Sequence, residues 1–350
     1  MLSQPRRRYE SASYPLEVPR PDADAAEQAR VRQTSLAKPV GSLGRLEALG
    51  AWASATQGRC PPEPFDDVRV VVFAGDHGIA ELSVSVHPPE ATRAMVATIA
   101  SGGAAVSVLA RGARAAVRVV DVAVSAETDV TDPDYKVRLA SGRLDREDTL
   151  SDSEVAQALS VGRSVADEEI DSGADLLIAG DVGVGNSTTA AAVVAAMTSA
   201  EPNRAVGRGS GVDDAGWMRK TAAVRDALRR ASGSTTDPLA LMRILGAADL
   251  AALAGFLAQA SLRRTPVLLD GLYSGAAALV AEALAPGAAR WWTAAHRSSE
   301  PALTLALRRL ELDPLLELDM RLGEGSGALL ALPLLQASVR ILAEMSGPQA

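Results

Sequence analysis

One stretch near the middle of the chain, Leu176 to Met197, limits the folds open to it more than any other. It starts with a short apolar run that stops at Gly180, and it ends with an alanine-rich segment that begins at Ala190. The turn between them combines glycines with an aspartate, an asparagine and hydroxyl side chains. This order is typical of a buried strand, a tight turn and a helix. It is the unit from which parallel α/β sheets are built.

The start of the predicted helix is a candidate anion site. The first N–H groups of a helix have no intrahelical partner, and with the macrodipole they attract phosphate. The spacing resembles a P-loop, except that Asn186 stands where the lysine of a P-loop would be. Without that cation, a nucleotide monophosphate or a phosphoribosyl group fits better than a triphosphate. For this loop by itself, a glycine-rich connection without a ligand is an equally good interpretation.

Composition excludes several classes of protein. The net charge is −8 and no basic stretch is interleaved with aromatic residues, so no nucleic-acid partner is expected. The single cysteine, Cys60, cannot form an internal disulfide, and the three histidines are too dispersed for a metal motif. We therefore expect no metal and no cofactor. No apolar stretch suits a secretory signal or a membrane span, which favours a cytoplasmic protein without a membrane partner.

Strand-like and helix-like segments alternate along the chain. The predicted fold is α/β, a doubly wound, mainly parallel sheet with helices on both faces. The expected strands are 68–74, 116–124, the run from Leu176, 266–269 and 290–294. The expected helices are 24–33, 92–101, 154–171 with a capping box at Ser151, 190–197, 217–230, 247–262 and a terminal helix to about Met345. Residues 1–25, rich in Arg, Pro, Ser and Asp, are expected to lack order.

Polar residues follow the predicted strands. Asp76 and His77 follow the first strand, Asp181 and Asp270 follow later ones, and Gly207–Gly211 forms a second glycine cluster. Because parallel strands end at one edge of a sheet, these residues predict a crevice there. For the Asp76–His77 pair, a structural role is favoured over a catalytic one.

The residue types in this crevice favour acid–base chemistry beside a held phosphate. No Gly-x-Ser-x-Gly nucleophile elbow follows a strand, whereas carboxylates are plentiful. Glu324 is the leading candidate, because it lies between Gly323 and Gly325, where the backbone can approach a ligand closely. Alternatively, Glu324 only precedes the terminal helix and favours its dipole. From the residues alone, a catalytic role and a helix-stabilising role for Glu324 are equally well supported.

An ordered set of motifs identifies a family resemblance. The set comprises Lys38–Gly44, Asp76–Gly78, Gly180–Thr189, Gly207–Gly211, Leu269–Gly271, His296–Glu300 and Arg321–Ala328. In this order they resemble the nicotinate-nucleotide:dimethylbenzimidazole phosphoribosyltransferases of the nucleotide-loop stage of cobalamin synthesis. The resemblance runs from about Lys38 to the terminal helix.

The resemblance implies a reaction and an organisation. In the family, 5,6-dimethylbenzimidazole displaces nicotinate from nicotinate mononucleotide, giving α-ribazole 5′-phosphate with inversion, and the glutamate matching Glu324 is the general base. It implies a large α/β domain at 65–305, a small helical domain made of 26–64 with 306–350, and a homodimer.

The resemblance also implies site residues. Glu324 and Asp181 are the catalytic candidates. The phosphate and ribose candidates are Gly183, Gly185, Asn186, Ser187, Thr188, Gly207, Gly209, Ser210, Gly211, Lys220, Asp270 and Ser298. The base-binding candidates are Ser85, His87, Met95, Leu322 and Gly323.

Three departures from the family pattern leave the acceptor base open. Asp181 stands where the family usually has glutamate, and Pro89 and Ala94 stand where many relatives carry glutamine. The acceptor could therefore be another benzimidazole, a purine or a phenol. A nucleotide- or benzimidazole-binding protein without catalysis is the alternative of another class, and the intact Arg321–Ala328 stretch argues against it.

Overall fold

The computed structural model describes residues 14–347, and its centre is a parallel sheet with the strand order β2-β1-β3-β4-β5. Its strands are β1 (Val68–Gly75), β2 (Ala116–Ala123), β3 (Leu176–Val182), β4 (Val267–Leu269) and β5 (Trp292–Ala294). A second, two-stranded parallel sheet joins β6 (His296–Arg297) to β7 (Leu316–Glu317). The chain runs from β1 outward to β2 on one side and to β3 on the other. The order therefore reverses between β1 and β3, and such a switch point is where open α/β sheets bind ligands.

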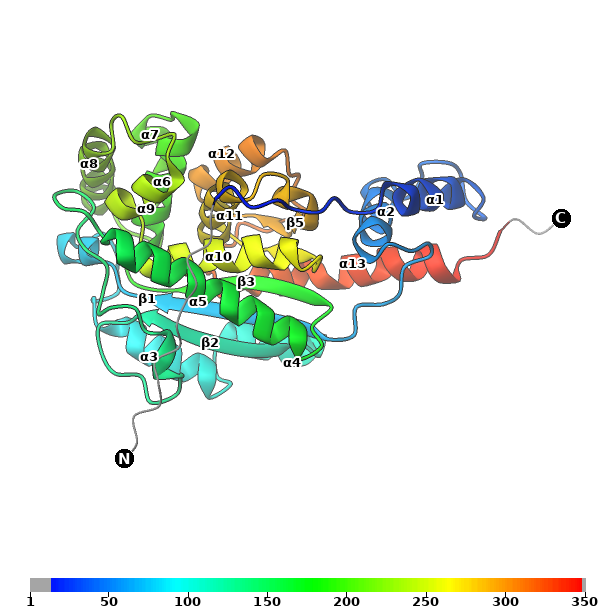
Figure 1. Cartoon of the computed structure of the whole chain (residues 1–350), viewed down its shortest axis with the longest axis horizontal. Helices are drawn as coiled ribbons and strands as arrows, with labels where there is room; N and C mark the ends of the chain where they lie inside the picture. Colours follow the sequence, from blue (N-terminus) through cyan, green and yellow to red (C-terminus); the bar gives the residue numbers. More distant parts are fainter. Residues whose placement is uncertain (1–13, 348–350) are drawn as a thin grey trace.

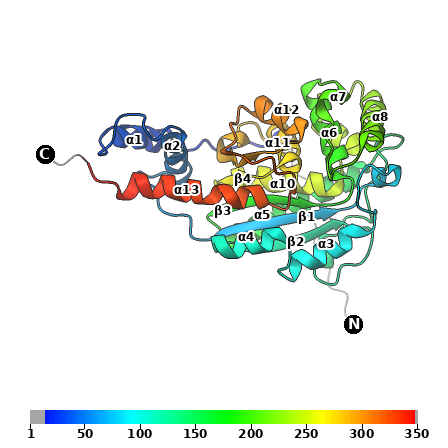
Figure 2. The ribbon, with the colours of Figure 1, turned by 180° about the vertical axis from the view of Figure 1, so that it is seen from behind.

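Helices cover both faces of the sheet, as the sequence predicts (Figure 1). Val71 and Phe73 of β1 face a core that includes α5 (Asp152–Asp171) and α10 (Ala248–Leu262). Val70 and Val72 face the opposite core, which includes α3 (Ala91–Ala100), α4 (Ala105–Ala113) and α13 (Ser326–Glu344). Figure 2 shows these last three helices on the side that Figure 1 leaves behind. Side-chain alternation along a strand produces the two cores.

The remaining helices extend the first core beyond the sheet. They are α6 (Asn186–Thr198), α7 (Pro202–Ala205), α8 (Asp214–Arg230), α9 (Pro238–Leu245), α11 (Leu272–Leu284) and α12 (Pro301–Leu310). Short 3-10 turns are η1 (Gly78–Leu82), η2 (Pro133–Tyr135) and η3 (Ala288–Trp291). Because η3 occupies the start of the strand expected at 290–294, β5 begins only at Trp292. The capping box at the start of α5 is confirmed: the Ser151 hydroxyl accepts from the Glu154 N–H, and the Glu154 carboxylate accepts in return.

The two ends of the chain meet in a helical group. Here α1 (Ala23–Thr34) and α2 (Arg45–Gln57) lie beside the C-terminal part of α13 (Figure 1). The Arg32 guanidinium donates to the Leu342 carbonyl oxygen at 2.5 Å. By contrast, α12 packs on α6 and α11. The division into two domains stays a prediction.

The segment before α1 differs from the expectation of disorder. Residues 1–13 lie outside the described residues. Residues 14–22 run along the large α/β part, where the Leu16 N–H donates to the Leu284 carbonyl at 2.8 Å and the Trp291 indole donates to the Pro19 carbonyl at 2.8 Å. These hydrogen bonds, and the packing of Tyr14, Leu16 and Val18 on the core, order this part of the chain.

Two stretches have the length and hydropathy of a membrane span, Ala91–Ala113 and Ser326–Glu344. Both belong to helices already described, and 56% of the most apolar window of Ser326–Glu344 is buried inside the fold. Length and composition of this kind are equally typical of core helices.

Candidate functional site

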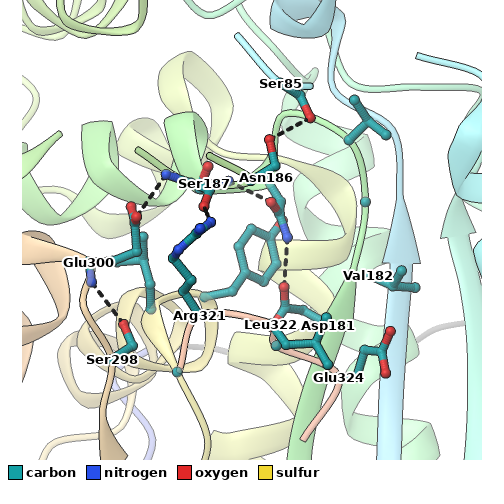
Figure 3. Close-up of a pocket in the computed structure, with 18 of the residues that line it drawn as sticks. Ser85, Asp181, Val182, Asn186, Ser187, Ser298, Glu300, Arg321, Leu322 and Glu324 are labelled. Carbon is teal, nitrogen blue, oxygen red and sulfur yellow. Dashed lines mark hydrogen bonds between the residues drawn. The ribbon is translucent and has the colours of Figure 1, made fainter. Parts of the chain in front are cut away.

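A cavity of about 680 Å³ opens at the carboxyl end of β3 and the start of α6 (Figure 3). Its walls also come from residues of the segments 85–95, 209–210, 271–273, 296–300 and 319–324, some in loops and others at the starts of helices or in β6. It therefore lies at the switch point of the sheet, where the sequence predicts a crevice.

Glu324 is placed by a turn that crosses over β3. Gly323, Glu324 and Gly325 all have positive φ, at 87°, 64° and 90°. The turn lies so close to the strand that a Cβ atom on Gly180 would be 2.6 Å from the Glu324 carbonyl oxygen. The Glu324 N–H in turn donates to the Asp181 carbonyl at 3.1 Å. Glycine at position 180 thus lets the far end of the chain settle on the central strand.

The Glu324 carboxylate lines the cavity, and from the described residues it accepts only a long hydrogen bond, from the Val106 N–H at 3.4 Å. Burial raises the pKa of Glu324, and the nearby Asp270 carboxylate adds to the shift. A weakly bonded carboxylate with a raised pKa is a suitable proton acceptor.

Asp270, rather than Glu324, is the carboxylate that stabilises the start of the terminal helix. Its two carboxylate oxygens accept from the N–H groups of Gly325 at 3.1 Å and Ala328 at 3.0 Å, at the start of α13. Asp270 therefore stabilises the N-terminus of this helix. It does not line the cavity, although it was expected to hold phosphate or ribose.

Asp181 lies in the cavity wall beneath the Glu324 turn. Its Oδ2 accepts from the Asn186 amide at 2.7 Å. Burial raises the pKa of Asp181 well above its usual range, and the carboxylates of Asp270 and Asp249 add to this. Asn186, which stands where a P-loop would have its lysine, is thus bonded to a carboxylate. Asn186 Oδ1 accepts a hydrogen bond from the Ser187 N–H.

The opposite wall carries the cations. Gly185, the N-cap residue of α6, has no side chain with which to cap the helix, and the Ser187 hydroxyl in the first turn accepts from the Lys220 ammonium group at 3.0 Å. Lys220 is fully buried behind the wall; burial lowers its pKa, and the Glu300 carboxylate opposes that shift. The Arg321 guanidinium donates to the Gly209 carbonyl, and the Gly209 N–H donates to Glu300 at 2.7 Å. Figure 3 shows Glu324 and Asp181 on one side of the pocket and Arg321, Ser187 and Glu300 on the other.

Most of the predicted site residues line this one cavity. They are Ser85, His87, Met95, Asp181, Gly183, Gly185, Asn186, Ser187, Gly209, Ser210, Ser298, Leu322, Gly323 and Glu324. Five others do not line it: Thr188, Gly207, Gly211, Lys220 and Asp270. Thr188 is fully buried on the inner face of α6, and its hydroxyl has no partner among the described residues. The individual binding roles stay predictions.

The binding and catalytic roles assigned from the sequence left out several residues that line the cavity: Tyr273, His296, Glu300, Asp319 and Arg321. Glu300 and Arg321 stand inside the motifs that carry the family resemblance, so the signal for them was present. Tyr273 follows Asp270 in a helix that reads as ordinary core, and only packing brings it to the cavity.

The loop before α3, together with Met95 in that helix, forms another wall of the cavity. The hydroxyl groups of Ser85 and Ser210 are 3.0 Å apart, and the Val86 N–H donates to Ser210 at 3.0 Å. Pro89 and Ala94, two of the departures from the family pattern, are exposed and do not line the cavity.

The Asp76–His77 pair holds structure together, as the residue pattern favoured. Asp76 accepts from the N–H and the hydroxyl of Ser125, both at 2.8 Å. His77 Nδ1 is 3.0 Å from the Thr189 hydroxyl. Within residues 14–347, no group of three His, Cys, Asp or Glu side chains could hold a metal ion.

Comparison with known proteins agrees with this site. A family model described as a phosphoribosyltransferase matches residues 18–350. The chain therefore belongs to a phosphoribosyltransferase family, and a switch-point cavity with Arg321 on one wall and carboxylates on the other is consistent with that class.

Relatives carry a more particular name. The nicotinate-nucleotide–dimethylbenzimidazole phosphoribosyltransferase of Mycobacterium avium (strain 104) is 58% identical over 331 residues, 93% of this chain and 94% of that protein. The protein of that name from Mycobacterium tuberculosis (strain ATCC 25618 / H37Rv) is 58% identical over 330 residues, 94% of this chain and 91% of its own length. The crystal structure of CobT from Thermus thermophilus matches with a TM-score of 0.88 and 41% identity, over 93% of this chain and 97% of that one. The chain belongs to the nicotinate-nucleotide–dimethylbenzimidazole phosphoribosyltransferase family, and it is therefore a transferase.

Proposed function

We propose that the chain transfers the phosphoribosyl group of nicotinate mononucleotide to 5,6-dimethylbenzimidazole, giving α-ribazole 5′-phosphate and nicotinate. The observation that carries this proposal is the Glu324 carboxylate, weakly bonded and with a raised pKa, in a cavity whose opposite wall is cationic. The names of the relatives supply the substrates.

The proposed reaction is a displacement at C1′ of the ribose. One imidazole nitrogen attacks C1′ while the C1′–N bond to nicotinate breaks, and the electron pair of that bond stays on the pyridine nitrogen. The other imidazole nitrogen gives its proton to the Glu324 carboxylate. The cationic wall, with the start of α6, Lys220 behind Ser187, and Arg321, would hold the 5′-phosphate. Holding both substrates in line removes much of the entropy cost of the encounter.

The test is Glu324→Gln, assayed for nicotinate release and for α-ribazole 5′-phosphate by chromatography. The amide keeps the shape of the side chain but cannot take the proton, so we expect kcat to fall by about 10²–10⁴-fold with KM for nicotinate mononucleotide little changed. In the wild type, kcat/KM should fall as the pH drops below the raised pKa of Glu324, because the protonated carboxyl is no base. The exposed Glu317→Gln is the matched control and should retain wild-type turnover. A Glu324→Gln variant with wild-type turnover would contradict the assignment.

A different acceptor base is the second candidate, and the departures at Asp181, Pro89 and Ala94 motivate it. Pro89 and Ala94 lie outside the cavity lining, so only Asp181 of the three can alter its shape. Release of nicotinate in the presence of dimethylbenzimidazole, other benzimidazoles, purines and phenols would rank the acceptors. If no base supports turnover while ligands still raise the melting temperature, the chain is a binding protein.

The proposed setting of the enzyme is a cytoplasmic homodimer with a small helical domain built from 26–64 and 306–350. Sedimentation of the purified chain tests the dimer, because a monomer and a dimer differ twofold in mass.

A further inference from the structure

A loop on one wall of the cavity depends on distant side chains for its position. It comprises residues 83–90, between η1 and α3, and contains the base-binding candidates Ser85 and His87; we call it the acceptor loop. Only Val84 in it is buried. Within the part of the chain that the structure describes, its backbone forms no hydrogen bond with the backbone of the sheet or of a distant helix. Side chains from other elements must therefore hold it in place.

Two ties hold the ends of the acceptor loop. At its start, the Arg219 guanidinium of α8 donates to the carbonyls of Leu82 and Ser83, both at 2.9 Å. Just past its end, the Thr92 hydroxyl in the first turn of α3 accepts from the Val184 N–H at 3.1 Å. Arg219 directly precedes the buried lysine of the cationic wall, and Val184 belongs to the turn between β3 and α6. Both ends of the loop are thus tied to elements of the cationic wall.

A pair of serine hydroxyls holds the middle of the acceptor loop. The Ser210 hydroxyl accepts from the Val86 N–H at 3.0 Å, and the Ser85 hydroxyl accepts from the His87 N–H at 3.1 Å. The two hydroxyl oxygens are 3.0 Å apart, so one hydroxyl donates to the other. Among the described residues the second hydroxyl proton has no acceptor. It is left for a ligand in the cavity, which both serines line.

Ser210 in turn follows a tightly held residue of the cationic wall. The Gly209 N–H donates to the Glu300 carboxylate at 2.7 Å, and the Gly209 carbonyl accepts from the Arg321 guanidinium. Gly209 has a φ of 53°, and a Cβ atom on it would be 2.7 Å from Lys220 Nζ. An anion held by the two cationic side chains therefore acts on the backbone directly beside Ser210.

We propose that Ser210 couples the two substrate sites. Binding of the phosphoribosyl donor on the cationic wall fixes Ser210, and Ser210 then fixes the acceptor loop, so that the donor and the acceptor base bind with positive cooperativity. The inference rests on the proposed function, because that function assigns the phosphate and the base to these two walls. Ser210 is then a positioning residue that acts through Ser85 and Val86, which differs from the phosphate-binding role that the resemblance implies for it.

The cooperativity has a physical origin in the ordering of the acceptor loop. An exposed loop without backbone hydrogen bonds to the core loses conformational entropy when a base binds to it. If the donor has already fixed the loop, that loss is smaller and the base binds more tightly. By linkage, the base must tighten donor binding by the same factor, and couplings between sites typically change affinity by about 5–150-fold.

The test measures the coupling with a donor fragment that cannot react. Ribose 5-phosphate carries the phosphate and the sugar but no nicotinate leaving group. Calorimetry on the full chain gives the dissociation constant of 5,6-dimethylbenzimidazole, or of the base that the acceptor panel ranks first, with and without saturating ribose 5-phosphate. We expect ribose 5-phosphate to tighten binding of the base by at least about fivefold in the wild type. Hydrogen exchange of the Val86 amide should also slow when ribose 5-phosphate is bound.

Variants assign the coupling to the Ser210 hydroxyl. Ser210→Ala should reduce the coupling to less than about twofold and abolish the slowing of Val86 exchange. Its affinity for ribose 5-phosphate alone should stay within about twofold of the wild type, because the hydroxyl is bonded to the acceptor loop. Ser210→Thr keeps the hydroxyl and should keep the coupling.

Two further variants test the ties and provide a control. Arg219→Ala removes only the tie at the start of the acceptor loop and should reduce the coupling partly. Ser83→Ala is the matched control, because Ser83 is an exposed serine of the same loop whose carbonyl, but not whose hydroxyl, is bonded among the described residues. It should keep the full coupling.

Three outcomes overturn the inference. The first is a wild type in which ribose 5-phosphate does not change the affinity for the base, or in which no base binds at all. The second is a folded Ser210→Ala variant that keeps the coupling. The third is a folded Ser210→Ala variant that loses affinity for ribose 5-phosphate alone by more than about tenfold, which would make Ser210 a phosphate ligand.

These outcomes are separate from failure of the proposed function. If nicotinate mononucleotide and dimethylbenzimidazole give no product but the coupling is present and depends on Ser210, the proposed function fails and the coupling stands. If turnover is normal but the coupling is absent, only the coupling fails.

Discussion

The strands β1 and β3 lie side by side, and near the end of each a glycine is followed by an aspartate, but the two aspartates have different partners. After β1, Asp76 is bonded to Ser125. In β3, Asp181 lines the cavity, and among the described residues its carboxylate accepts a hydrogen bond from the Asn186 amide alone. The difference comes from what covers each strand end. The chain between β2 and α5 closes over β1, whereas the Gly323–Gly325 turn passes over β3 and leaves space beyond it.

The largest effect is expected from a substitution that displaces the Gly323–Gly325 turn from β3. Gly180→Ala would place a methyl group 2.6 Å from the Glu324 carbonyl oxygen, a backbone atom that cannot rotate away. We expect a loss of about 3 kcal/mol in the free energy of unfolding. We also expect kcat/KM to fall by about 100-fold, because Glu324 is displaced. Urea unfolding and the transfer assay measure the two effects.

Gly112→Ala is the matched control. This glycine is in α4, and nothing lies within 4 Å of the position its Cβ would take. Alanine there should raise stability by about 0.5–1 kcal/mol and leave activity unchanged. Equal effects of the two substitutions would show that the turn over β3 tolerates a side chain.

Replacing the two aspartates by asparagine sharpens the comparison. Asp181→Asn should cost at least about tenfold in kcat/KM, since Asp181 lines the cavity and an amide there does not reproduce the carboxyl group that holds Asn186. Asp76→Asn should leave kcat/KM near the wild-type value but cost about 1 kcal/mol of stability, because its hydrogen bonds from Ser125 lose their charge assistance. The transfer assay and urea unfolding on both variants measure the contrast.

Asp181 also makes the stability of the fold depend on pH. The folded state raises the pKa of Asp181, so above the ordinary aspartate range the unfolded chain binds fewer protons than the native one, and stability falls as the pH rises. Asp181→Asn should remove that decline. Urea unfolding at mildly acidic and mildly alkaline pH measures it, and an unchanged slope in Asp181→Asn would contradict the assignment.

The smallest effects separate two neighbouring threonines at the start of α6. Thr189→Val removes the partner of His77 Nδ1 and should cost about 1–3 kcal/mol in the free energy of unfolding. Thr188→Val removes a buried hydroxyl that has no partner among the described residues, so it should leave stability unchanged or raise it by up to about 1 kcal/mol. A large rise in KM for nicotinate mononucleotide in Thr188→Val would restore Thr188 as a phosphate ligand.

Much of the fold could be predicted because its signals are local. The apolar run before Gly180, the alanine-rich helix after it and the capping box at Ser151 all depend on residues adjacent in sequence. The carboxyl-edge crevice also followed from the sequence, since parallel strands must end together. Local signals did not reveal that residues 14–22 pack along the large part of the chain, because those residues bond to Leu284 and Trp291, far away in sequence.

The site itself was predictable as a set of residues but not as an arrangement. Sequence determined that Glu324 stands between two glycines and that Asp181, Asp270 and Asn186 lie at or after the ends of strands. Only the tertiary structure decided that Asp270 holds the start of α13, that Asn186 faces Asp181, and that Thr188 turns inward. The physical reason is that a polar side chain takes the partner that packing brings within reach, and here most of those partners come from distant parts of the chain.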